Sequence, residues 1–147
     1  MSAVADILHI TRQFKAPRDR VFAAFTSAEM LALWMGPGPC AVSKATVDLR
    51  VGGAYRFIID NPEGQMCVGG TYREIKAPEK LVFTWAWEDD DDWEGVESVV
   101  SIEFLAHGVE TEMRFTQTGF PSPESSGRHE HGWGGSFDKL DGVLATA

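Results

Sequence analysis

The sequence predicts an α+β fold in which a curved antiparallel sheet of about six or seven strands wraps around one long C-terminal helix. Residues 45–118 alternate between apolar and polar side chains and are interrupted by short turns, which is typical of antiparallel strands. Residues 122–147 instead repeat apolar side chains at helical spacing. A sheet with one apolar face needs a cover, and the C-terminal helix is the one long enough to supply it. We expect a single domain over residues 1–147.

The first strand is predicted around residues 8–14. Leu8, Ile10 and Phe14 share one face, and Arg12 falls on that same face. An arginine there either snorkels to water or points inward and pairs with a carboxylate. Our first choice of partner is Glu74, in a structural ion pair.

Two short helices are expected between residues 17 and 35. Pro17 ends the first strand and suits the start of a helix. Thr26 and Glu29 have the spacing of a capping box, which predicts the start of the second helix. The Gly-Pro-Gly-Pro run at 36–39 then predicts a loop.

Strands fill most of the middle of the chain. Turn residues at 52–53, 61–64, 77–79 and 107–108 and an acidic stretch at 88–94 separate them. The alternating segments are 54–60, 66–75, 81–87, 96–105 and 109–116.

The C-terminal helix has a Ser122-Pro123 start and an apolar stripe that includes Trp133 and Phe137. It is also rich in glycine, and each glycine inside a helix costs about 0.5–1 kcal/mol relative to alanine. Packing against the sheet must therefore hold it. The alternative is a loop over 122–135 with a helix that starts near Trp133.

The composition of the chain disfavours some classes of binding partner and some cellular locations. The net charge of −9 disfavours nucleic acid and anionic membrane surfaces. No stretch has the apolar length of a membrane span, and no secretory signal is visible. The two cysteines, Cys40 and Cys67, lack metal-type spacing and are expected to be free thiols in the cytoplasm.

Six segments of the sequence carry motifs, at 14–22, 33–37, 48–57, 78–85, 116–120 and 132–140. These motifs resemble those of the family named after the activator of the heat-shock-protein ATPase. This family belongs to the START-like, or SRPBCC, superfamily, and the resemblance implies its helix-grip fold. Met35 stands where the family often has a second tryptophan, which would alter the mouth of a cavity.

The inner faces of the strands and the helix stripe predict a hollow lined by aromatic and apolar side chains, as in a small-molecule site. Trp34 and Met35 are expected at its rim. His129 is a further polar group that could reach it. The candidate ligand-binding residues are Arg12, Trp34, Met35, Tyr55, Phe57, Tyr72, Glu74, Trp85, Trp87, Met113, Trp133 and Phe137.

No catalytic, cofactor or metal motif is found in the sequence. His129 and His131 lie two apart and would not share a helix face, and Asp89–Asp92 lacks the pattern of a calcium loop. The favoured function is therefore binding of a small apolar or aromatic molecule without turnover. One alternative, suggested by the family name, is a stress-related regulatory protein that contacts a chaperone or another protein; a homodimer is a further option. The other is a cyclase or hydratase, as in some START-like relatives, which would need an acid/base pair inside the cavity.

Overall fold

The computed structural model describes residues 7–36, 38–88 and 90–145. Seven strands, three α-helices and one 3₁₀ turn follow one another in this part of the chain. In order they are β1 (Ile7–Phe14), α1 (Arg18–Thr26), α2 (Ala28–Trp34), β2 (Ala41–Val47), β3 (Ala54–Asn61), β4 (Gly64–Lys76), β5 (Lys80–Trp87), η1 (Asp91–Trp93), β6 (Ser98–His107), β7 (Glu110–Thr118) and α3 (Pro123–Ala145).

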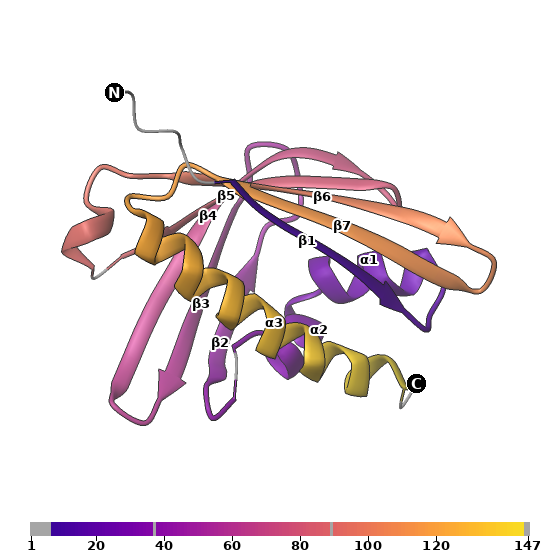
Figure 1. Cartoon of the computed structure of the whole chain (residues 1–147), viewed down its shortest axis with the longest axis horizontal. Helices are drawn as coiled ribbons and strands as arrows, with labels where there is room; N and C mark the ends of the chain where they lie inside the picture. Colours follow the sequence, from indigo (N-terminus) through magenta and orange to yellow (C-terminus); the bar gives the residue numbers. More distant parts are fainter. Residues whose placement is uncertain (1–6, 37, 89, 146–147) are drawn as a thin grey trace.

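The strands form one curved antiparallel sheet in the order β1-β7-β6-β5-β4-β3-β2. Consecutive strands from β2 to β7 are neighbours, and β1 closes the far edge against β7 with Arg12 opposite Met113. Helix α3 runs across the sheet, and α1 and α2 lie towards the C-terminal end of α3 (Figure 1). The predicted helix-grip α+β architecture is confirmed.

Helix α3 begins at Pro123, immediately after Ser122. The Ser122 hydroxyl accepts a hydrogen bond from the backbone N–H of Ser125 at 3.1 Å, as expected of an N-cap. The helix runs from Pro123 to Ala145, so the alternative of a loop over 122–135 is wrong. Residues 146–147 of the predicted range lie outside the described residues. Trp133 and Phe137 are buried on the face towards the sheet.

The two short helices meet at Ser27. The Ser27 hydroxyl accepts a hydrogen bond from the backbone N–H of Met30 at 3.3 Å and caps α2. The predicted cap, Thr26, is instead the last residue of α1, and its hydroxyl donates back to the carbonyl of Phe22. The capping prediction was therefore one residue early, because Ser27 has the extended backbone that a cap requires.

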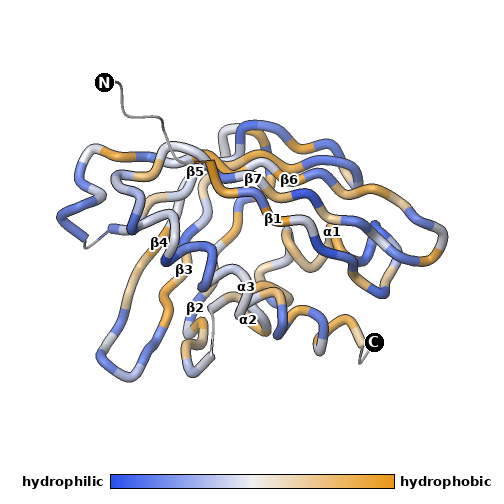
Figure 2. The backbone as a smooth tube through the Cα atoms, viewed as in Figure 1, coloured by the Kyte–Doolittle hydropathy of each residue, from blue (hydrophilic) through white to orange (hydrophobic). Residues whose placement is uncertain are grey.

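The core lies between the sheet and the helices. Figure 2 shows hydrophobic and hydrophilic residues alternating along β6 and β7, which gives these strands one apolar face. Phe104, Phe115 and Phe137 are almost completely buried, and the ring of Phe25 lies 5.4 Å from that of Phe104 and 6.1 Å from that of Phe137 between centroids.

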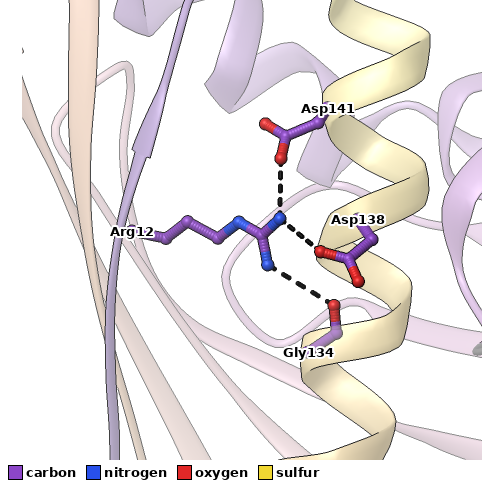
Figure 3. A network of polar contacts seen from close by, with 4 residues as sticks. All are labelled: Arg12, Gly134, Asp138 and Asp141. Carbon is purple, nitrogen blue, oxygen red and sulfur yellow. Dashed lines mark hydrogen bonds and ion pairs between the residues drawn. The ribbon is translucent and has the colours of Figure 1, made fainter.

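Arg12 connects β1 to α3 (Figure 3). Its guanidinium donates to Asp138 at 2.5 Å and to Asp141 at 2.6 Å, and it also reaches the carbonyl of Gly134 at 3.4 Å. Arg12 thus points towards the helix, but the predicted pairing with Glu74 is wrong. Glu74 lies on β4, four strands from β1, and contacts Lys76 and Lys80.

Candidate functional site

A cavity of about 430 Å³ lies between the N-terminal half of α3 and the β3–β5 part of the sheet. The exposed residues on its lining, such as Met66 and Arg128, show that it reaches the protein surface. Its lining consists of Met35, Gly36, Cys40, Ile59, Gln65, Met66, Cys67, Trp85, Trp87, Asp90, Trp93, Ser125, Arg128, His129, Gly132, Trp133 and Ser136.

Helix α3 supplies one wall of this cavity. Ser125, His129 and Trp133 recur every four residues, so they occupy one helix face. Trp133 is 4% exposed and donates its indole N–H to Gln117 on β7 at 2.8 Å. This contact fixes the helix against the sheet at the inner end of the cavity.

His129 is held by hydrogen bonds on both ring nitrogens. Its Nε2 accepts from the indole N–H groups of Trp87 at 2.9 Å and Trp85 at 3.3 Å. Because Nε2 accepts, Nδ1 carries the proton and donates to the carbonyl of Ser125 at 2.7 Å. Burial lowers the pKa of His129, and the positive charge of Arg128 lowers it further, against the opposing effect of the Ser125 carbonyl. The imidazole is therefore a neutral structural link between sheet and helix.

Three of the tryptophans form an aromatic corner. The rings of Trp85 and Trp87 are perpendicular, at 89° and 5.6 Å between centroids. Trp133 approaches Trp85 at 4.7 Å with the rings inclined by 50°. A fourth ring, that of Trp93 from η1, lies 5.5 Å from His129. The apolar wall is thus built from strand, helix and loop together.

The loop after α2 forms a further wall and is fastened to α3. The backbone N–H of Gly36 donates to the hydroxyl of Ser136 at 3.1 Å. Lys139 donates to the carbonyl of Cys40 at 2.7 Å. Both contacts join the loop to the helix, so this wall is tied to α3 at two points.

A second, much smaller void of about 20 Å³ lies deeper in the fold. Met35, Trp85 and Trp133 line both spaces and therefore separate them. The void is also lined by Tyr55 and Tyr72, and it has room for about one water molecule. Met35 is flexible, so its side chain is the adaptable part of the partition.

The tyrosines of the void stay protonated at neutral pH. The hydroxyl of Tyr55 donates to the carbonyl of Thr84 at 2.5 Å, and burial raises the pKa of Tyr55 well above its usual value. Burial likewise raises the pKa of Tyr72 to about 12. Neither phenol is a base at this site.

The structure brings together four of the predicted ligand-binding residues in the cavity: Met35, Trp85, Trp87 and Trp133. Three more, Tyr55, Phe57 and Tyr72, line the inner void instead. Trp34, Met113 and Phe137 are buried core residues, and Arg12 and Glu74 form ion pairs elsewhere.

Trp34 does not lie at the rim. It is fully buried, its indole N–H donates to the carbonyl of Ala24 at 2.8 Å, and its ring packs against Phe25 at 4.8 Å. The helix turns this side chain towards α1, whereas Met35, the next residue, turns towards the cavity.

Several lining residues were not among the predicted ones. Trp93 was missed because it lies in a stretch that was interpreted as an acidic loop. A single tryptophan among aspartates could have indicated a buried side chain that holds the loop against the core, and Trp93 is indeed buried. Ser125 extends the α3 stripe by one turn beyond His129, so helical spacing could have found it. Met66, Asp90 and Arg128 carried no such signal.

Ser125 is the one described residue with a buried side-chain polar atom that lacks a hydrogen-bond partner. It is 1% exposed and lines the cavity. A buried hydroxyl without a partner costs free energy, roughly 1–3 kcal/mol. The Ser125 oxygen has almost no accessible surface, so a water-sized group in the cavity does not reach it.

Within the described ranges, no group of three or more His, Cys, Asp or Glu side chains is arranged to hold a metal ion. No helix among the described residues is both long and apolar enough to cross a membrane.

A family model described as activator of Hsp90 ATPase homolog 1-like protein matches residues 15–145. The chain belongs to this family. The match covers every element from α1 to α3, and the family's fold supports a general role in ligand binding or regulation. A comparison with curated proteins found no match.

Three solved structures illustrate the same fold. The AHSA1 protein from Silicibacter pomeroyi is 31% identical, with a TM-score of 0.85, and the alignment covers 96% of this chain and 99% of that one. A protein from Chromobacterium violaceum is 24% identical, with a TM-score of 0.85 and coverage of 94% and 96%. A protein from Rhizobium leguminosarum is 23% identical, with a TM-score of 0.83 and coverage of 99% and 98%.

Proposed function

We propose that this protein binds a small, mostly apolar molecule in the cavity between α3 and strands β3–β5. The observation that carries the proposal is a space of about 430 Å³ walled by four tryptophans. This volume falls within the range of small-molecule sites, about 300–1,000 Å³. Aromatic walls with few polar anchors favour affinity over selectivity, so several related compounds should bind.

Binding without turnover is favoured over catalysis. Acid/base chemistry would need a free proton acceptor or donor in the cavity. His129 is the residue best placed for this, but its Nε2 already accepts from two indole N–H groups and its Nδ1 donates to a carbonyl. The arrangement therefore supports a structural role for His129.

Calorimetric titration with 1-naphthylmethanol, a flat aromatic alcohol, tests the proposal. We expect saturable one-to-one binding with a dissociation constant of about 10–100 μM, as for a ligand of this size in an apolar site. The absence of saturable heat up to about 1 mM would reject it.

Two variants locate the site. Met66 lines the cavity and pairs in register with Ile59, another lining residue, so Met66→Trp should fill the space and abolish binding. The control is Val109→Trp, which adds the same ring at an 80% exposed position in the turn between β6 and β7. Equal affinity in both variants would place the ligand elsewhere.

A further inference from the structure

The cavity combines aromatic walls with an acidic mouth. Asp90 is an exposed residue on its lining, and the same loop continues with Asp91, Asp92 and Glu94, all exposed. Asp90 makes no ion pair with another described residue; its carboxylate accepts only a backbone hydrogen bond, from the N–H of Asp92 at 3.0 Å. The carboxylate of Asp90 is therefore not neutralised by an ion pair within the described part of the chain.

Tryptophan is the side chain that attracts cations most strongly through its ring. Trp85, Trp87, Trp93 and Trp133 all line this one space. The rings of Trp85 and Trp87 are perpendicular to each other, so they form two walls of a corner instead of one flat stack. A cationic group beside such a corner can interact with more than one ring.

The tryptophan corner contains no charged imidazole that would repel a cationic ligand. His129 lies among these rings, and the indole N–H groups that it accepts require a neutral Nε2. Among the described residues of the lining, Arg128 is the one permanent cation, and it is exposed.

We propose that the cavity prefers protonated amines with an aromatic body, held by the tryptophan walls and the carboxylate of Asp90. This preference rests on the proposed function and names the class of ligand. The net charge of −9 would also attract organic cations from solution. Arg128 opposes the preference, so its removal should strengthen it.

Three probes with the same ring system test this: 1-naphthylmethylamine, 1-naphthylmethanol and 1-naphthoate. Alkylamines are protonated at neutral pH, as the lysine side chain is. In calorimetric titrations at low salt, we expect the amine to bind about tenfold more tightly than the alcohol, and the carboxylate to bind most weakly. Salt at about 0.5 M should reduce the advantage of the amine by screening Asp90.

Matched variants identify the residues responsible. Asp90→Asn keeps an oxygen that can accept from the Asp92 N–H, and it should lower the affinity for the amine about threefold relative to the affinity for the alcohol. Asp19→Asn, on α1, is the control and should change neither. Arg128→Gln should tighten amine binding because it removes a positive charge from the lining. This variant tests the role of charge at the cavity through a second exposed side chain.

Equal binding of amine and alcohol, or tighter binding of the carboxylate, would overturn this inference and leave the proposed function standing. The same holds if Asp90→Asn and Asp19→Asn have equal effects. Failure of all three probes to bind would reject both proposals together.

Discussion

The indole N–H of Trp87 donates to Nε2 of His129 across a distance of 2.9 Å and so joins strand β5 to helix α3. Trp87 is only partly buried, whereas the neighbouring donor, Trp85, is 3% exposed. The bond therefore closes one side of the cavity near the surface. It also requires an unprotonated Nε2, which makes the integrity of this wall depend on pH.

The first prediction concerns that dependence. Because the pKa of His129 is lowered in the folded protein, the unfolded chain binds the proton more readily. Its contribution to stability is complete above the unfolded pKa, about 6.5, and is lost as the pH falls towards the folded pKa. Wild type should thus lose more stability than His129→Gln between about pH 7.5 and 5.

Thermal melts of both proteins across this range measure the difference, and the other histidines cancel because both proteins carry them. Parallel curves for the two proteins would show that His129 does not titrate differently on folding.

The second prediction concerns Trp133. It packs against Phe115 at 4.9 Å and stacks on Phe137 at 5.7 Å, so Trp133→Ala should lower the free energy of unfolding by about 3–5 kcal/mol. Leu33→Ala, at a 61% exposed position, is the control and should change it by less than about 0.5 kcal/mol. Urea melts give both values; a loss below about 1 kcal/mol for Trp133→Ala would mean that the helix does not grip the sheet there.

The third prediction concerns the buried polar chain behind Trp133. Gln117 accepts from the Trp133 indole and donates to the hydroxyl of Ser98 at 3.0 Å, which in turn donates to the carbonyl of Trp85 at 2.6 Å. Gln117→Leu leaves the buried Trp133 N–H without a partner and should cost about 1–3 kcal/mol. Combining it with Trp133→Phe, which lacks the N–H, should be less than additive in urea melts. Strict additivity would show that the two side chains are not coupled.

The fourth prediction concerns Arg12. Asp138 and Asp141 are substantially exposed, with 73% and 45% of their side-chain surface accessible, so solvent screens both ion pairs. Arg12→Gln should therefore cost only about 0–1 kcal/mol, and less at high salt. Denaturation at two ionic strengths checks this. A cost above about 2 kcal/mol, independent of salt, would contradict the surface character of the pair.

The alternation of side chains was enough to predict β1 and β3–β7, because one face of each strand is buried and the other is wet. Strand β2 was not among the predicted alternating segments, and it begins at Ala41, before the predicted strand region. The glycines of α3 weakened the local helix signal, yet the cap at Ser122 and the stripe through Trp133 located it correctly. The spacing of apolar side chains therefore predicts secondary structure well where the buried residues recur at regular intervals.

The alternation of side chains could not predict which residues on different strands form ion pairs. Periodicity placed Arg12 on the inner face but carried no information on which strands are neighbours, so Glu74 could not be excluded. Neighbouring strands lie about 4.8 Å apart, so four strands separate the two by roughly 19 Å. The same limit applied to Tyr55. The sequence pattern predicted that its side chain points inward, but it could not predict that Met35, Trp85 and Trp133 separate the inner void, where Tyr55 lies, from the cavity.

The central claim is that a small molecule occupies the cavity, and the five indole N–H signals in a ¹H–¹⁵N NMR spectrum test it most directly. Trp85, Trp87, Trp93 and Trp133 line the cavity, whereas Trp34 is buried in the core and bonded to Ala24. Titration with 1-naphthylmethanol should shift the four cavity signals along saturable curves with one common dissociation constant and leave the Trp34 signal in place. No saturable shift, or a shift of the Trp34 signal while the other four stay fixed, would contradict the account.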